Sequence, residues 1–173
     1  DKDFPKVINQ SNIALQICQA GNIRTALMCL DLAVSAKAFD RIILATDTPT
    51  GTGVMPLGMI KTICEMSCLS SYPPEMIISA ATGNNSVIYK LNNGFIERGK
   101  DADIVILDTA LGCSKKDALS SIKNGDYPAI TAVFTQGIPR FIGRSRNTPP
   151  PTKKIKVYRN KILNPFDPGR HTI

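Results

Sequence analysis

The sequence predicts a fold of class α/β plus β, in which β/α units come first and short β-elements follow. Three observations support this order. The stretch Ile42 to Ala45 is continuously apolar, which is typical of a strand buried on both faces of a parallel sheet. A helix-spaced apolar pattern precedes it from Ile23. After Asn93, short apolar runs alternate with turns instead.

The first part of the chain predicts a strand, a helix and a second strand joined by short links. The apolar stretch Ile13 to Cys18 leads into Gly21-Asn22, and Asn22 is a plausible helix N-cap. Helix-spaced apolar residues follow at Ile23, Ala26, Leu27, Leu30, Ala33 and Val34. We expect this helix to end near Phe39. Because the links are short, the two strands should be parallel neighbours with a right-handed crossover.

Two or three helices are predicted between the second strand and residue 92. Pro56 suits the first turn of a helix reaching about Leu69, with one face marked by Leu57, Ile60, Cys64 and Cys68. Pro73-Pro74-Glu75 begins the next helix. Thr82-Gly83-Asn84-Asn85 should break it, and Ser86 to Leu91 should add one or two further turns.

The remaining chain predicts a small β-rich unit with one helix. Asn93-Gly94 and Gly99-Lys100 should bracket a short strand around Phe95 and Ile96, followed by a strand from Ile104 to Leu107. A helix from Ser114 to Asn124 should end at Gly125. Last comes a hairpin, with strands Ala129 to Thr135 and Ile138 to Ile142 joined by Gln136-Gly137. We therefore expect three segments: residues 1–92, 93–148 and a basic, proline-rich tail at 149–173.

The charge distribution argues against a nucleic-acid-binding groove. The chain has 173 residues and a formal net charge of +7. Residues 137–173, which include the tail, hold nine basic residues and one acid, so this segment accounts for +8 and residues 1–136 for −1. Such a tail, with Pro149 to Pro151 followed by lysines, is typical of an extended or weakly ordered arm. Aromatic residues are also few for a stacking platform.

Cysteine usage and the absence of a long apolar run predict a cytoplasmic protein. The five cysteines form no close CxxC pair, which is the pattern of reduced, buried thiols. Cys64 and Cys68 lie one helical turn apart, but no second pair or nearby histidine suggests a metal site. No run approaches the roughly 18 apolar residues of a membrane span. Because the chain begins with Asp1 and has no signal-like segment, we expect further sequence upstream.

Asp47 is the main candidate functional residue. It lies where the strand Ile42 to Ala45 ends, and catalytic groups of α/β sheets and barrels gather at the carboxyl ends of strands. The alternative is that Asp47 only stabilises the turn. Nearby loop residues could offer hydroxyls and amides to a polar ring: Gln19, Asn22, Thr48, Thr50, Gly51, Thr52 and Gly53. A phosphate cradle at Gly51-Thr52-Gly53 is excluded, because neither GK[ST] nor G-x-G-x-x-G is present.

Several of these motifs resemble the carboxyl-terminal half of the metal-dependent amidohydrolase superfamily. The resemblance depends on the strand-end Asp47, on the helix running into Ala80-Ala81-Thr82-Gly83-Asn84, and above all on GFIERGKDADIVILD at residues 94–108. Its most specific part is the G-x-I-x-x-G-x-x-A-D pattern from Gly94 to Asp103. Within the superfamily, the stretch DTPTGTGVMPLGMI around Asp47 and the SRNTPP ending at residues 145–150 resemble hydrolases of cyclic amides. The resemblance implies the last β/α units of a (β/α)8 TIM-like barrel, followed by part of a small β-sandwich.

The same resemblance implies hydrolysis of a cyclic amide such as a lactam or enamide. One or two divalent metal ions, zinc or iron, would hold a hydroxide, since such ions lower the pKa of bound water to about 7. Asp47 would ligate a metal and shuttle the proton to the leaving nitrogen. The family's other ligands are histidines and a bridging Lys or Glu on earlier strands. None can be recognised here, because His171 in the tail is the only histidine.

This shortage of ligands leaves two interpretations of the chain. In the first, it is part of a hydrolase whose metal site is completed upstream, and the assembly is a homo-oligomer, as the resemblance implies. In the second, it is a non-catalytic remnant or interaction module in which Asp47 is only a turn residue. An open piece of barrel exposes apolar strand edges, which favours the first interpretation.

Overall fold

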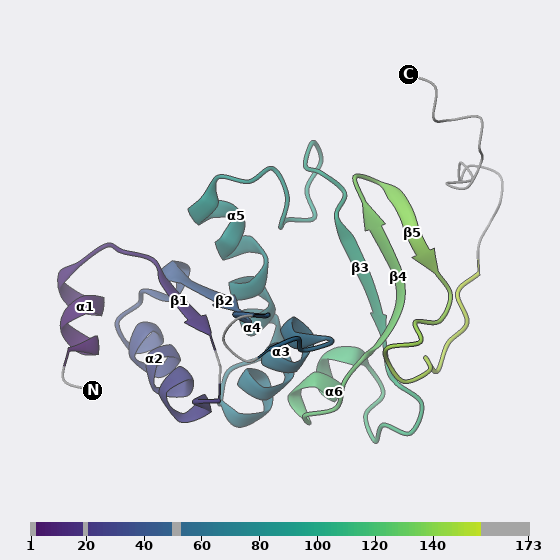
Figure 1. Ribbon diagram of the computed structural model, residues 1–173, viewed down its shortest axis with the longest axis horizontal. Helices are drawn as coiled ribbons and strands as arrows, with labels where there is room; N and C mark the ends of the chain where they lie inside the picture. Colours follow the sequence, from purple (N-terminus) through teal and green to yellow (C-terminus); the bar gives the residue numbers. More distant parts are fainter. Residues whose placement is uncertain (1–2, 19–20, 50–52, 157–173) are drawn as a thin grey trace.

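The computed structural model describes residues 3–18, 21–49 and 53–156, and its five strands form two separate sheets (Figure 1). The strands are β1 (Leu15–Cys18), β2 (Ile42–Ala45), β3 (Ile104–Asp108), β4 (Ala129–Thr135) and β5 (Ile138–Ile142). The helices are α1 (Phe4–Gln10), α2 (Ile23–Ser35), α3 (Gly58–Leu69), α4 (Pro74–Ala81), α5 (Gly83–Tyr89) and α6 (Ala118–Lys123), with a 3₁₀ turn at Phe39–Arg41.

The first β/α unit confirms the predicted parallel strand pair. β1 pairs with β2 in parallel, from Leu15 opposite Ile42 to Cys18 opposite Ala45. The first three residues of β2 are buried, as their unbroken apolar character predicts. Asn22 caps α2 as expected, since its side chain accepts a hydrogen bond from the Thr25 amide at 3.2 Å.

The predicted end of α2 is wrong by four residues. The helix ends at Ser35, because Lys37 adopts a left-handed conformation (φ 56°). The amides of Lys37 and Ala38 then donate to the carbonyls of Val34 and Ala33 at 3.0 and 2.8 Å. This pair of bonds is a Schellman motif, which satisfies the last helical carbonyls and turns the chain toward β2.

Helices α3, α4 and α5 follow the prediction closely. α3 ends at Leu69 as expected but begins at Gly58, two residues after Pro56. Its buried residues include Ile63, Cys64, Met66 and Ser67. The predicted stripe is therefore wrong except at Cys64, because Leu57, Ile60 and Cys68 are only half-buried. Pro74 begins α4, as predicted. The break between α4 and α5 is confined to Thr82, because Gly83 and Asn84 already belong to α5.

The second sheet confirms the predicted hairpin. β4 pairs antiparallel with both β3 and β5, giving the order β3-β4-β5. Gln136 and Gly137 both have positive φ angles, 52° and 74°, as the two-residue turn requires. Helix α6 begins at Ala118 rather than Ser114, because the Asp117 carboxylate caps it through the Ser120 amide at 2.8 Å.

The strand predicted around Phe95 and Ile96 is wrong. This segment lies in a loop that closes on itself: the Asp101 amide donates to the Asn92 carbonyl at 2.8 Å, and the Lys100 amide to the Glu97 carbonyl at 3.2 Å. These hydrogen bonds join backbone groups within the loop instead of pairing the segment with a neighbouring strand. Ile96 is consequently 94% exposed.

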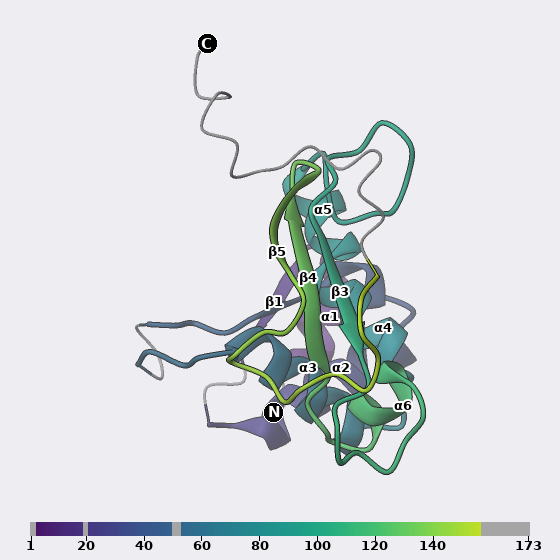
Figure 2. The ribbon, with the colours of Figure 1, turned by 90° about the vertical axis from the view of Figure 1, so that its right-hand side faces the viewer.

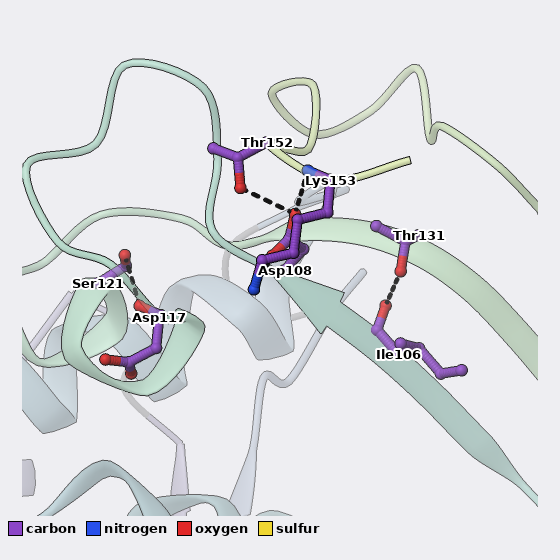
Figure 3. A network of polar contacts seen from close by, with 7 residues as sticks. All are labelled: Ile106, Asp108, Asp117, Ser121, Thr131, Thr152 and Lys153. Carbon is purple, nitrogen blue, oxygen red and sulfur yellow. Dashed lines mark hydrogen bonds and ion pairs between the residues drawn. The ribbon is translucent and has the colours of Figure 1, made fainter. Parts of the chain in front are cut away.

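Part of the tail predicted as an arm is anchored to the second sheet. The Leu111 amide donates to the Pro150 carbonyl at 2.7 Å, and the Thr152 amide to the Thr109 carbonyl at 3.0 Å. The Asp108 carboxylate accepts from the Thr152 hydroxyl and the Lys153 amide at 3.1 and 2.8 Å (Figure 3). Residues 150–153 are therefore held beside the end of β3.

Figure 1 shows α3, α4 and α5 between the two sheets. The main core joins β1, β2, α2, α3 and α4, and it also contains Ile122 of α6. Figure 2 presents the β3-β4-β5 sheet in front of these helices. Within the described part of the chain, no helix is long and apolar enough to cross a membrane.

Candidate functional site

Asp47 lies two residues beyond the carboxyl end of β2, with its side chain on an exposed part of the surface. Its backbone is left-handed, with φ 55°, a conformation in which aspartate and asparagine are enriched among non-glycine residues. Because Cys18 pairs with Ala45, the segments that follow β1 and β2 leave from the same edge of the sheet. The structure therefore places Asn22 and Asp47 beyond the same end of the strand pair, the carboxyl end.

The loop after Asp47 is held by the side chain of Thr48. The Thr48 hydroxyl donates to the Gly53 carbonyl at 2.7 Å and accepts from the Met55 amide at 3.2 Å. Both partners come from the far side of the loop. Thr48, predicted as a substrate-contacting residue, thus uses its donor and one acceptor position in bonds to its own loop.

The other predicted binding residues are only partly described. Asn22 is exposed, and its side-chain oxygen is occupied by the helix cap. Gly53 is exposed with φ 75°, and its carbonyl receives the Thr48 hydroxyl. The remaining candidates lie outside the described residues: Gln19, Thr50, Gly51 and Thr52.

Asp47 is a suitable ligand for a hard or borderline divalent cation, but the described residues do not complete a metal site. No group of three or more His, Cys, Asp and Glu side chains in residues 3–18, 21–49 and 53–156 could hold an ion. His171 lies outside these ranges. A protein site for zinc needs three or four protein ligands, so the described residues alone do not complete one.

The thiols of Cys64 and Cys68 do not supply a second metal site. Cys64 is buried, and its Sγ donates to the Asp126 carbonyl at 3.6 Å. Burial is the largest of the causes that raise the pKa of the Cys64 thiol to about 12, and the neighbouring Cys68, Asp126 and Glu65 contribute in the same direction. Within the described ranges, the two thiols belong to no group of three or more His, Cys, Asp and Glu side chains that could hold an ion.

Two residues that support β2, one at each of its ends, were not identified from the sequence as supporting residues. The Asn84 side-chain amide donates to the carbonyls of Phe39 and Ile42 at 2.9 and 2.7 Å, which ties α5 to the start of β2. At the other end of β2, a Cβ at Gly58 would lie 3.2 Å from Cγ2 of Thr46. Asn84 belonged to a motif that pointed to the superfamily, whereas Gly58 gave no signal that could be detected without the fold.

An apolar cavity of about 380 Å³ lies elsewhere, between α3 and α4 on one side and β3 with its preceding loop on the other. Its lining includes Met59, Ile63, Ile78, Phe95, Val105 and Leu107. Asp47 is not among the lining residues, and the walls carry few polar groups. One carboxylate, Asp103, also lines the cavity, and its two oxygens accept hydrogen bonds from the Asn93 side chain and the Gln136 amide.

Comparison with known proteins confirms the resemblance seen in the sequence. The family model described as "Amidohydrolase family" matches residues 3–140. An enamidase from Eubacterium barkeri is 35% identical over 156 residues, which cover 90% of this chain and 40% of the enamidase. A crystal structure of enamidase, described as a new member of the amidohydrolase superfamily, matches with a TM-score of 0.84 at 35% identity.

The structural match covers 88% of this chain and 40% of the enamidase chain. This chain therefore spans about two fifths of the length of the relative that it matches.

Proposed function

The chain belongs to the amidohydrolase family, and from this premise we propose that it forms part of the active site of a metal-dependent hydrolase of cyclic amides. In this proposal the two β/α units around β1 and β2 belong to a (β/α)8 barrel, and Asp47 is the catalytic aspartate at the mouth. The remaining metal ligands come from sequence outside this chain. The observation that carries the proposal is the position of Asp47 at the carboxyl edge of a parallel strand pair.

Asp47 has the properties that the reaction needs. A carboxylate has lone pairs for a cation on one oxygen and for a water hydrogen on the other. Asp47 lies two residues beyond a buried strand, which fixes the point where its loop begins, and its side chain is exposed. An Asp47 Oδ can therefore accept a proton from the attacking water and later return it to the leaving nitrogen.

A divalent ion, zinc or iron, would polarise the amide carbonyl and acidify water when bound. This chain would contribute Asp47 to its coordination. The loops after β1 and β2 would line the entrance for a small polar ring. Asn22 belongs to the first of these loops and Gly53 to the second. We expect the assembly to be a homo-oligomer.

The substrate class follows from the enamidase relationship. A lactam with an adjacent carbon-carbon double bond, such as 6-oxo-tetrahydronicotinate, is the ring that we expect the site to open. Enamidase shares 35% identity with this chain across residues that include the Asp47 loop region. That level of identity supports a common reaction type in the complete protein.

The test is the variant Asp47→Asn in the complete, metal-loaded enzyme. Asparagine also favours the left-handed conformation of Asp47, so the fold should be unchanged. Loss of general acid-base catalysis should lower kcat by about 10²–10⁴-fold. Hydrolysis would be followed by the ultraviolet absorbance of the enamide, and folding by circular dichroism.

Asp40→Asn is the matched control, because Asp40 is exposed at the opposite end of the same strand. Its kcat should equal that of the unmodified enzyme. Full turnover by Asp47→Asn would remove Asp47 from the mechanism and refute the proposed function.

A further inference from the structure

Asp47 is flanked by two threonines whose polar groups bond across it. The Thr48 amide donates to Oγ1 of Thr46 at 3.4 Å, a contact that passes over Asp47. The Thr48 hydroxyl then reaches forward to the Gly53 carbonyl and the Met55 amide, at 2.7 and 3.2 Å. The backbone next to Asp47 is thus bonded through these two side chains, to Thr46 before it and to Gly53 and Met55 after it.

The preceding residue, Thr46, is restrained by packing. Gly58, the first residue of α3, is buried, and a Cβ built on it would lie 3.2 and 3.5 Å from Cγ2 and Cβ of Thr46. No ordinary side chain could occupy position 58 without displacing Thr46. The absence of a side chain at Gly58 therefore allows the strand end and the helix start to approach each other closely.

We propose that Thr48 is a positioning residue that holds the Asp47 carboxylate in its working orientation, through the bonds of its hydroxyl to Gly53 and Met55. This inference rests on the proposed function of Asp47. A carboxylate that both contacts a cation and moves a proton must keep its two oxygens aimed at different targets. Displacement of such a group by about 1 Å can cost roughly 100-fold in rate.

A hydroxyl is well suited to this role because it donates and accepts at once. At Thr48 the donor meets a carbonyl and the acceptor meets an amide, so a single oxygen joins residue 48 to residues 53 and 55. Asp47 follows the last paired residue of β2 by two positions, so the strand ladder alone does not hold it. The Thr48 bonds supply that restraint.

The experiment compares Thr48→Val with Thr48→Ser in the complete, metal-loaded enzyme. Valine keeps the shape of threonine but lacks the hydroxyl, whereas serine keeps the hydroxyl. We expect Thr48→Val to lower kcat by about 10–100-fold with KM within about twofold, and Thr48→Ser to recover most of the loss. Thr82→Val is the matched control, since among the described contacts the Thr82 hydroxyl bonds only to the Ile78 carbonyl of the preceding helix, α4.

A second readout does not depend on turnover. Hydrogen exchange of the peptide containing Met55 reports the bond from its amide to Oγ1 of Thr48. Protection of this amide should fall in Thr48→Val and persist in Thr48→Ser and Thr82→Val. If Thr48→Val fails to fold, Thr48→Ala and Thr48→Ser replace the pair, because they differ only in the hydroxyl.

The outcomes separate this inference from the proposed function. Equal kcat for Thr48→Val and Thr82→Val would overturn the positioning role, as would equal losses in Thr48→Val and Thr48→Ser. Loss of activity in Asp47→Asn together with either result would refute only the inference about Thr48. Activity retained in Asp47→Asn would instead refute the proposed function.

Discussion

Lys123, at the end of α6, should be one of the most important single residues for stability. Its Nζ donates to the carbonyls of Ser67, Ser70 and Tyr72 at 2.9, 2.7 and 2.8 Å. These carbonyls surround the C-terminus of α3, where backbone acceptors lack helical partners and the helix dipole is negative. One ammonium group thus joins α6 to the end of α3 and to the turn before α4.

The variant Lys123→Met keeps much of the aliphatic chain and removes the ammonium. A hydrogen bond to a charged group contributes about 1.5–3 kcal/mol. The three bonds share one desolvation cost and are not additive, so we expect a loss of about 2–4 kcal/mol in the free energy of unfolding. For a chain of this length, each kcal/mol lowers Tm by about 2–4 °C. The expected decrease in Tm is therefore roughly 4–16 °C.

Thermal and urea unfolding followed by circular dichroism would measure this loss. Lys116→Met is the control, because Lys116 is exposed in the loop before α6. Its effect should stay within about 0.5 kcal/mol. A decrease in stability for Lys123→Met no larger than that of Lys116→Met would show that the three bonds contribute nothing beyond those to water.

Three further predictions concern other contacts. Asn84→Ala should lower the free energy of unfolding by about 1–3 kcal/mol in urea titrations, because it leaves two carbonyls at the start of β2 without their donor. An unchanged urea midpoint would contradict this prediction. Partial burial of Asp108 opposes its ionisation, but hydrogen bonds from Lys153, Thr109 and Thr152 outweigh burial and hold the pKa of Asp108 below its usual value. The contribution of Asp108 to stability is thus present above about pH 4 and is lost as pH falls through its lowered pKa. Cleavage of residues 150–153 by an acid-active protease should therefore accelerate at that low pH. An equal cleavage rate at all pH values would refute the link between Asp108 ionisation and the docking of these residues. Burial raises the pKa of Cys64 to about 12, so peptide mapping after iodoacetamide treatment at pH 8 should find Cys64 alkylated far more slowly than the partly exposed Cys113; comparable labelling would be inconsistent with its burial.

The outline of the candidate site could be predicted from residues close together in the sequence. The apolar run Ile42 to Ala45 predicted a buried strand, which the structure confirms, and Asp47, two residues beyond its end, is the candidate that this position suggests. The bonds that restrain Asp47 could not be predicted. The Thr48 hydroxyl has many possible partners in a loop, and its choice of Gly53 and Met55 depends on the path that the backbone takes.

The sequence by itself determined the features that arise within a few residues. Asn22 as an N-cap, Pro74 at the start of α4 and the Gln136-Gly137 turn follow from local dihedral preferences and nearby hydrogen bonds. The superfamily was also recognisable, because its pattern from Gly94 to Asp103 is contiguous.

Only the tertiary structure decided how separate segments restrain one another. The segment at Phe95 and Ile96 has strand propensity, yet its loop closes on itself. Residues 150–153 have a tail composition, yet they dock on Asp108, more than 40 positions earlier. Asn84 and Lys123 likewise bond to carbonyls from distant segments. Backbone carbonyls are present at every residue, so no sequence pattern marks the ones that a distant donor will meet; the packing of the helices and sheets selects them.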